Sequence, residues 1–231
     1  MFYILDIYLM FIQNKKSKFL MYHAFSETHF RRYCMNINQF KNQKINNDYI
    51  VTFDDGSESL YRYRDIISTK GQSQILFIRT DKINNKNYLK STQIQSLSNI
   101  FKIQSHSHSH PNHFLLNDNQ IRQEGIISKQ NIENITGNPV KSYAFPGGDW
   151  SSRSIKILAE IGYRNFFTSV PLFLTKKLSY NGIILNIHGR VEIFSPGFST
   201  IEEYFRFTIL SSRLLRHIFS FSNSFIKSRV I

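Results

Sequence analysis

The stretch DYIVTFDDG, residues 48–56, is an apolar run that ends at two carboxylates and a glycine. Short runs rich in Ile, Val and Phe are typical of strands buried on both faces. Successive side chains of a strand point in opposite directions, so one of Asp54 and Asp55 can bind a metal ion while the other handles protons. Gly56 permits a tight turn after the strand. Asp-Asp-Gly is also an ordinary turn sequence, so a purely structural role stays open.

Apolar runs of the same kind recur along the chain and end at polar or titratable side chains. The runs are residues 18–23, 48–55, 73–80, 100–106, 140–146, 163–169 and 182–188. Between them, residues 59–71 and 151–163 carry apolar residues at helical spacing and stop near a glycine. Strands that alternate with helices predict an α/β fold with a parallel sheet, and seven strands are enough to curl the sheet into a barrel. Such a barrel has its active site at the C-terminal ends of the strands, where these titratable residues lie.

The composition fits one globular domain. The 231-residue chain is 41% hydrophobic and 15% aromatic, with no linker-like shift in composition. Its formal charge of +13 favours an acidic partner, but the basic residues are scattered. Paired Cys/His fingers and an aromatic RNA-binding signature are absent from the sequence, so we expect no nucleic-acid partner. The single cysteine, Cys34, excludes an internal disulfide.

The two ends of the chain differ from its middle. Residues 1–17 form an apolar and basic lead-in that makes a poor signal peptide, because Asp6 interrupts the apolar run and no small-residue cleavage site follows. We expect the barrel to comprise residues 18–204. Residues 205–231 form a basic amphipathic segment, which is either a helix packed on the barrel or a surface helix in peripheral contact with a membrane. These features predict a location in the cytoplasm or at the inner membrane face of a bacterium.

Histidines are concentrated in IQSHSHSHPNH, residues 103–113, which holds four of the chain's eight. His106 and His110 are four residues apart, so both can reach one ion if the loop folds as a helical turn. With Asp55 they form a two-histidine, one-carboxylate set that suits Zn²⁺, Fe²⁺, Co²⁺ or a related cation. A solvated histidine-rich loop that binds metal loosely accounts for the same residues equally well.

The order of these motifs resembles that of the polysaccharide deacetylases, the metal-dependent carbohydrate esterases with NodB homology. FLMYH precedes VTFDDG, IQSHSHSHPNH follows about fifty residues later, and YAFPGG comes next. The similarity runs from about Lys18 to Glu203 and is closest to the branch whose third motif reads Tyr/Phe-Pro-x-Gly. The resemblance implies a distorted seven-stranded β/α barrel, in agreement with the number of apolar runs.

The resemblance also implies roles for individual residues. Asp54 resembles the catalytic base. One divalent metal ion, foremost zinc with cobalt, iron or nickel as alternatives, would be held by Asp55, His106 and His110. His108 and His113 are interpreted as bystanders, although His108 is also a candidate alternative ligand or a support for the ligands.

The third motif departs from the common family pattern at two positions. Ala144 stands where many members have an arginine that orients the catalytic aspartate, and Gly147 stands where they have an aromatic residue. The Tyr/Phe-Pro-x-Gly branch lacks the arginine as well. Gly147 remains a candidate oxyanion donor, because the donor is a main-chain N–H.

The last motif is ambiguous. His188 in ILNIH resembles the general acid of a Leu-x-His element, whereas NIHGRVEIF also fits the branch pattern in which Arg190 follows the strand as a structural residue. In the second case Asp54 shuttles the proton in both directions. A structural histidine at a strand end also accounts for His188. His23, at the end of the first apolar run, is a candidate substrate contact.

Together these residues predict a hydrolase acting on linear amides, which removes N-acetyl groups from an amino-sugar-containing glycan with a metal-activated water. The expected partner is an N-acetylated glycan or a lipid-linked or nucleotide-linked sugar. One alternative is a barrel that binds glycans but has lost turnover, as the missing arginine suggests. Another is a basic surface that binds an anionic polymer, which only the charge of +13 motivates.

Overall fold

The part of the chain that a computed structural model describes comprises residues 18–28, 33–45, 47–169 and 175–193. The predicted lead-in, residues 1–17, and the predicted amphipathic segment, residues 205–231, lie outside these ranges, as does the end of the predicted barrel segment. In the described ranges, no helix is both long enough and apolar enough to cross a lipid bilayer.

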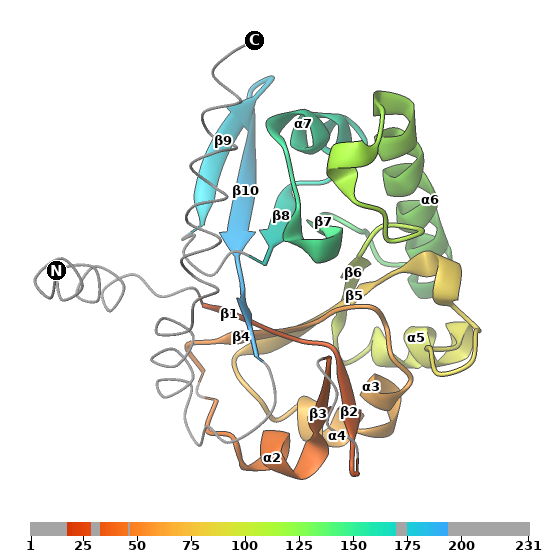
Figure 1. Cartoon of the computed structure of the whole chain (residues 1–231), viewed down its shortest axis with the longest axis vertical. Helices are drawn as coiled ribbons and strands as arrows, with labels where there is room; N and C mark the ends of the chain where they lie inside the picture. The colour runs from red at the N-terminus through yellow and green to blue at the C-terminus, as the bar shows by residue number, and fades with distance from the viewer. Residues whose placement is uncertain (1–17, 29–32, 46, 170–174, 194–231) are drawn as a thin grey trace, which may run out of the picture.

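A nine-stranded sheet forms the centre of the molecule, in the order β11-β1-β4-β5-β6-β7-β8-β10-β9 (Figure 1). Neighbouring strands are parallel except β9, which pairs antiparallel with β10. Every apolar run predicted as a strand contributes one to this sheet. The strands are β1 Phe19–Tyr22, β4 Ile50–Phe53, β5 Ser73–Ile78, β6 Lys102–Ser105, β7 Ser142–Ala144, β8 Asn165–Thr168, β9 Lys176–Tyr180, β10 Ile183–Gly189 and β11 Val191–Glu192. A separate parallel pair consists of β2 Ala24–Ser26 and β3 Cys34–Asn36.

The sheet curls because the consecutive strands β10 and β11 pair with strands near opposite ends of the strand order. β10 pairs with β8, and β11 pairs with β1 at the other end of the strand order. Only Arg190 separates β10 from β11, so the two ends of the sheet must come together at this residue. The predicted α/β fold with a curled, mainly parallel sheet is therefore confirmed.

Apolar side chains pack on both faces of the sheet. Leu76 belongs to a large cluster that also contains helix residues such as Ile121 and Leu158, which places the helices on this face. The next residue, Phe77, points to the opposite face. There it belongs to a small cluster that consists of Ile75, Phe77, Ala144 and Phe167. This second face lies inside the curled sheet.

The helices agree with the sequence only in part. Residues 59–71, predicted as one helix, form two short helices that break at Tyr63, and residues 151–163 contain one helix as predicted. Three other helices were not predicted, among them α6, the longest described. The helices are α2 Ile37–Asn42, α3 Ser59–Arg62, α4 Arg64–Ile67, α5 Ser91–Leu97, α6 Asp118–Thr136 and α7 Ser152–Glu160, and the single 3₁₀ turns are η1 Thr80–Lys82, η2 His113–Leu115 and η3 Pro146–Gly148. Helices α5 and α6 lie along the same side of the sheet, whereas α2, α3 and α4 gather near β2 and β3 (Figure 1).

Candidate active site

Asp54 and Asp55 follow β4 with different backbone conformations. The Asp54 N–H donates to the Tyr22 carbonyl at 3.0 Å, so Asp54 continues the pairing of β4 with β1. Asp55 and Gly56 are left-handed, with φ of 71° and 80°. A positive φ is costly for an aspartate and persists only where the surrounding structure imposes it, often at a functional site. The turn gives the two carboxylates different surroundings. Asp54 is 2% exposed, whereas the Asp55 side chain is 33% exposed.

Arg190 is the partner of Asp54. Its guanidinium donates from Nη1 to Oδ1 at 2.6 Å and from Nη2 to Oδ2 at 2.7 Å. The same guanidinium contacts the Thr52 hydroxyl and donates to the Thr168 carbonyl, both at 3.2 Å. Burial alone would raise the pKa of Asp54, but the positive charge of Arg190 and the nearby His106 lower this pKa to about 2. Asp54 is therefore ionised at neutral pH and held in one orientation.

His106 follows β6 and brings a ring nitrogen to both aspartates. Its Nδ1 lies 2.9 Å from the carbonyl oxygen of Ala144, an acceptor that requires a proton on Nδ1. Its Nε2 lies 3.7 Å from Asp54 Oδ2 and 3.6 Å from Asp55 Oδ1. Burial lowers the pKa of His106, and the two carboxylates oppose this effect. When the ring is neutral and its proton is on Nδ1, the lone pair of Nε2 points toward the carboxylates. This is the protonation state and orientation that a metal-binding histidine needs.

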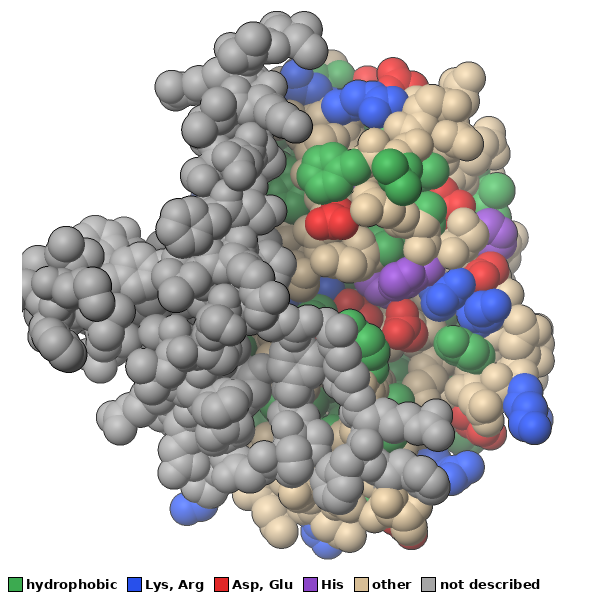
Figure 2. Space-filling view, viewed as in Figure 1, with side chains coloured by type: hydrophobic (Ala, Val, Ile, Leu, Met, Phe, Trp, Pro, Cys, Tyr) green, Lys and Arg blue, Asp and Glu red, His purple; other side chains and the backbone are tan. Residues whose placement is uncertain are grey.

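His110 completes a group of three candidate ligands with Asp55 and His106. Its Nε2 lies 3.6 Å from Asp55 Oδ1, and its ring centroid lies 4.9 Å from that of His106. One ligand atom from each of the three side chains lies within 4.8 Å of the others. In the described ranges this is the one group of His, Cys, Asp or Glu side chains with such spacing. Figure 2 shows histidine and acidic side chains side by side on the surface of this face.

The group fits a divalent cation. Asp55 Oδ1 is buried and has no hydrogen-bond partner among the residues that the structure describes, a state that is costly unless something else compensates the oxygen. The two histidine Nε2 atoms lie 3.6 Å from this oxygen, whereas ligands at about 2.1 Å from one tetrahedral ion lie about 3.4 Å apart. Two imidazoles and one carboxylate suit zinc and related transition metals, and they leave positions for water.

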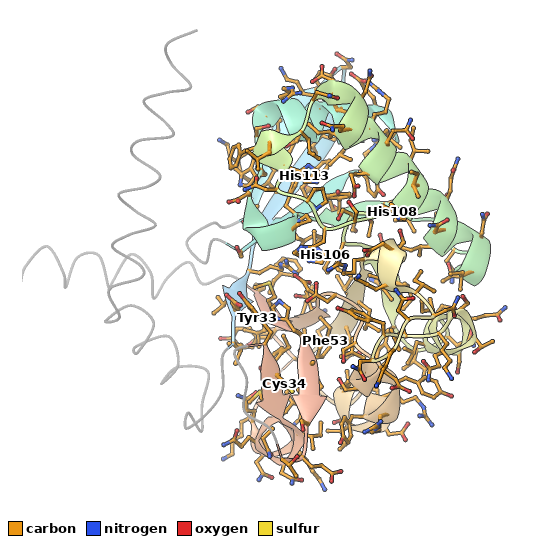
Figure 3. The ribbon with its side chains drawn as sticks, turned by 45° about the vertical axis from the view of Figure 1, so that its right-hand side comes forward. Tyr33, Cys34, Phe53, His106, His108 and His113 are labelled. Atoms are coloured by element: carbon orange, nitrogen blue, oxygen red, sulfur yellow. The ribbon has the colours of Figure 1, made fainter. Side chains whose placement is uncertain are left out.

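His108 and His113 lie apart from this group (Figure 3). The His108 Nδ1 lies 2.9 Å from the hydroxyl of Thr80 in η1. His113 is 1% exposed in η2, and its Nε2 lies 2.9 Å from the Tyr143 hydroxyl. Ser107 has a φ of 66°, and this turn in the backbone explains why His106 and His108 do not share a face as they would in an extended segment.

The third motif forms the turn η3 after β7. The Ala144 side chain packs in the inner apolar cluster, while its carbonyl oxygen holds His106. Gly147 is exposed with a φ of 64°, and its carbonyl oxygen accepts from the Ser169 hydroxyl at 3.0 Å. Of the atoms in the described part of the chain, a Cβ built on Gly147 would meet only Asp149 Oδ2, at 3.9 Å.

His23 follows β1 and lies among the charged groups of the site. Its ring centroid is 4.7 Å from that of Tyr33. Burial lowers its pKa, while the charges of Asp54 and Asp55 oppose this effect. His23 is therefore close enough to both carboxylates to be influenced by their charges, and its role as a substrate contact stays a prediction.

His188 lies within β10, between aromatic rings. Its ring centroid is 4.7 Å from those of Phe19 and Phe167, and its Nδ1 lies 2.8 Å from the Thr175 hydroxyl. Burial lowers the pKa of His188 to about 4. The imidazole is therefore neutral at neutral pH, which disfavours a proton donor. Its assignment as the general acid stays a prediction.

A curled parallel sheet with an ionised aspartate and a candidate metal group at its strand ends defines the chain as an α/β-barrel enzyme. The family model for polysaccharide deacetylases matches residues 41–166, more than half of the 231 residues. The chain belongs to the polysaccharide deacetylase family, and it is a deacetylase-type enzyme, as the motifs predicted. Among curated protein sequences, no match to the chain is found.

Solved structures of deacetylases share the fold. A polysaccharide deacetylase from Bacillus cereus is 22% identical with a TM-score of 0.68, and the match covers 84% of this chain and 69% of that one. A Streptococcus pyogenes deacetylase in complex with acetate is 17% identical with a TM-score of 0.62, covering 76% and 92%. A de-N-acetylase from Aggregatibacter actinomycetemcomitans is 14% identical with a TM-score of 0.59, covering 80% and 98%. These likenesses confirm the predicted deacetylase-type barrel.

The contact between Arg190 and Asp54 was not predicted from the sequence. Arg190 was expected only as a structural residue, in one of two interpretations of the last motif, and the absence of an arginine at Ala144 suggested an impaired site. The guanidinium next to Asp54 instead comes from Arg190, between β10 and β11. The available signal was the arginine directly after an apolar run, at the same strand end as the other titratable residues.

Proposed function

We propose that the chain hydrolyses N-acetyl groups on an amino-sugar-containing glycan. The observation that carries this proposal is the convergence of the ion-paired Asp54 with the group formed by Asp55, His106 and His110. Membership of the polysaccharide deacetylase family supports a glycan substrate. Acetate and a free amino sugar would be the products.

Asp54 is the proposed base. A divalent cation held by Asp55, His106 and His110 would lower the pKa of a water molecule and polarise the acetyl carbonyl. Asp54 then accepts the proton of this water, while Arg190 keeps the carboxylate in one orientation. Because the pKa of Asp54 is about 2, the aspartate holds a proton only weakly and can pass it on.

Gly147 is the proposed oxyanion donor. It is exposed, and nothing within 3.9 Å of a built Cβ blocks the approach of a substrate. A main-chain N–H is a suitable donor for the developing negative charge of a tetrahedral intermediate. The turn η3 places this residue beside the strand that holds His106.

The leaving amine needs a proton, and we propose His23 as its first source. Burial lowers the pKa of both His23 and His188, but the charges of Asp54 and Asp55 oppose this effect at His23. His188 has aromatic neighbours and a pKa of about 4. Asp54 itself is the second candidate, since it has just received a proton. The alkaline limb of the pH profile distinguishes them, because only loss of the responsible imidazole removes this limb.

The substrate proposal includes free N-acetylated glycans and lipid-linked or nucleotide-linked N-acetyl sugars. The alternative of a glycan-binding barrel without turnover was based on the absence of an arginine at Ala144. Arg190 contacts Asp54 from β10–β11 instead, so no observation favours that alternative.

Metal analysis combined with acetate release from a panel of these substrates tests the proposal. The wild-type protein should hold one equivalent of metal and release acetate in a metal-dependent way. His106→Ala should lose stoichiometric metal and activity. The matched change His108→Ala, two residues away in the same loop but outside the ligand group, should retain both. Asp54→Asn should keep the metal and lose about 10²-fold to 10⁴-fold in rate, as expected for a missing general base.

Two results would contradict the roles proposed for these residues, and a third would contradict the reaction. Stoichiometric metal in His106→Ala together with its loss in His108→Ala would move the ligand set to the other histidines. Loss of metal in Asp54→Asn would make Asp54 a ligand and exchange the roles of the two aspartates. Metal binding without acetate release on any N-acetyl sugar would refute the proposed reaction and leave the metal site in place.

A further inference from the structure

The turn between His106 and His110 is held from outside by Glu124 of helix α6. We propose that Glu124 is a positioning residue for the metal site, which keeps this turn in the shape that brings both histidines to Asp55. The inference rests on the proposed metal site but not on the identity of the substrate.

The turn needs external support because its backbone is strained. Ser107 and His110 are both left-handed, with φ of 66° and 64°. Such a conformation is costly for a non-glycine residue and persists only where other contacts impose it. Inside the turn, the Ser107 hydroxyl accepts from the His110 N–H at 3.0 Å, and this bond alone joins the two strained residues.

Glu124 satisfies three donors of the turn. Its Oε2 accepts from the N–H groups of His108 and Ser109, both at 2.8 Å. Its Oε1 accepts from the Ser109 hydroxyl at 2.6 Å. Hydrogen bonds to an ionised acceptor are stronger than neutral ones, so one carboxylate fixes the middle of the turn.

The opposite side of the turn is fixed by the segment after β5. The carbonyls of Ser107 and His108 accept from the N–H groups of Thr80 and Asp81, at 3.3 Å and 3.0 Å. The donors of the turn thus point to α6 and its acceptors point to η1. Removing Glu124 would leave one side of the turn without its partners.

Helix α6 is itself a rigid support for Glu124. The Gly125 carbonyl accepts from the Tyr163 hydroxyl at 2.9 Å. One turn further on, the Ser128 hydroxyl lies 2.6 Å from that of Ser105, the last residue of β6. A hydrogen bond therefore joins β6, the strand that precedes His106, to α6, the helix that carries Glu124.

The test compares Glu124→Ala and Glu124→Gln with the control Glu133→Ala. Glu133 lies on the same helix and also accepts from a backbone N–H, that of Val140, at 2.8 Å, but it does not contact the turn. The measurements are the zinc dissociation constant by chelator competition and the visible absorption spectrum of the Co²⁺-loaded protein. The spectrum reports ligand geometry, which a change in overall stability would not alter.

We expect Glu124→Ala to weaken zinc binding by about 10-fold to 100-fold, the usual effect of losing a residue that orients metal ligands. Its Co²⁺ spectrum should differ from that of the wild type. Glu124→Gln keeps one carbonyl acceptor and should fall between the two. Glu133→Ala should lower the melting temperature without changing zinc affinity or the spectrum.

Wild-type zinc affinity and spectrum in both Glu124 variants would overturn the inference. The same holds if Glu133→Ala weakens zinc binding as much as Glu124→Ala, because the effect would then be one of general stability. If Glu124→Ala does not fold, Glu124→Gln decides alone, and unchanged affinity in this variant counts against the role. Acetate release is not among these readouts, so failure of the proposed reaction is separate from failure of this inference.

Discussion

Asp54 keeps a negative charge in a place that is almost closed to water. The carboxylate is 2% exposed and Arg190 is 1% exposed, so both charges depend on each other for stability. Removing one member of a buried ion pair costs about 3–5 kcal/mol, since the other charge is left uncompensated. The pair is thus a requirement of the fold as well as of the proposed chemistry.

We predict that Arg190→Met destabilises the protein by about 3–5 kcal/mol at neutral pH. In the wild type the pKa of Asp54 is about 2, below its ordinary value of 3.8, so its contribution to stability is present above pH 3.8 and is lost as the pH falls towards 2. Without Arg190, burial instead raises this pKa, and the variant should lose stability as the pH rises through it. Denaturant unfolding between pH 3 and pH 7 measures both trends.

The double variant Asp54→Asn/Arg190→Met is the control for this prediction. It removes both charges, so it should be more stable than Arg190→Met at pH 7. A double variant that is no more stable than the single one would show that lost packing of Arg190, rather than an uncompensated carboxylate, causes the effect.

His113 is a second buried titratable residue, outside the ligand group. Its Nε2 bonds to Tyr143, and its buried Nδ1 has no hydrogen-bond partner within the described ranges. Burial lowers the pKa of His113 from 6.5 to about 4. The neutral imidazole fits this pocket, whereas the imidazolium would need a partner that the pocket does not provide.

We predict that His113→Leu reduces the acid sensitivity of the protein. The pKa of this histidine is 6.5 in the unfolded chain and about 4 in the folded protein. Its titration therefore leaves the free energy of unfolding unchanged above pH 6.5 and lowers it as the pH falls towards 4, because the unfolded chain binds the proton first. At pH 5 this loss is about 2 kcal/mol relative to pH 7.5. The free energy of unfolding of wild type and variant at these two pH values measures the difference. Equal losses in the two proteins would assign the acid sensitivity to the other buried histidines.

Among the short elements, the turn η3 depends on two glycines with different surroundings. Gly148 has a φ of 79°, and a Cβ there would clash with the Ser169 hydroxyl and lie 2.6 Å from the Ser169 backbone nitrogen. Gly147 has a similar φ but open space around it. The first glycine of the pair is therefore exposed, and the second lets the turn pack against the end of β8.

We predict that Gly148→Ala destabilises the protein far more than Gly147→Ala. Alanine at Gly147 bears only the cost of the left-handed backbone, about 1–2 kcal/mol. Alanine at Gly148 adds a backbone clash with Ser169, which the end of β8 can relieve only by moving, and the total should exceed about 3 kcal/mol. Melting temperatures of the two variants provide the comparison, and equal shifts would contradict the close packing of η3 on β8.

Most strands of the curled sheet were predictable from the sequence, and the longest described helix was not. Seven of the nine strands lie in apolar runs, so their burial on both faces is visible in the residues themselves. The other two were not predicted, because β9 is largely exposed and β11 has only two residues. Helix α6 is rich in Asn and Gln and buries few residues, among them Ile121 and Ile132, so its periodicity is weak. Its ends carried the better signal, because Asn117 caps the first turn together with Gln120 and Gly137 ends the helix.

The candidate ligands were also predictable, whereas the partners that orient them were not. Asp55, His106 and His110 belong to short motifs whose order resembles a known family. Arg190 contacts Asp54, which is 136 positions away along the chain, and Glu124 contacts His108, which is 16 positions away. Contacts of this kind depend on how the sheet closes and how α6 packs, and no local pattern in the sequence encodes them.

In the molecule as a whole, the candidate metal site joins strands that are not neighbours. Asp55 follows β4 and His106 follows β6, and β5 lies between these two strands in the sheet. An ion bound to Asp55 and His106 would link the C-terminal ends of β4 and β6. Binding to the folded state alone would therefore stabilise the whole curled sheet.

We predict that zinc raises the melting temperature of the wild type and that chelation reverses this change. At free zinc one hundred times the dissociation constant the stabilisation is about 2.7 kcal/mol. His106→Ala should show no such dependence, while His108→Ala should respond as the wild type does. Differential scanning calorimetry with and without chelator measures the effect, and a zinc response in His106→Ala would place the ion elsewhere.

The segment that closes the sheet has a consequence for how the protein is made. Asp54 leaves the ribosome more than a hundred residues before Arg190, because the seam between β10 and β11 comes late in the chain. Until then, a nascent chain cannot bury Asp54 without leaving its charge unpaired. We therefore expect the curled sheet to close only after synthesis has passed the seam, so that an incomplete chain stays open and does not form a stable barrel without its arginine. Formation of the Asp54–Arg190 ion pair and completion of folding would then be one event during translation.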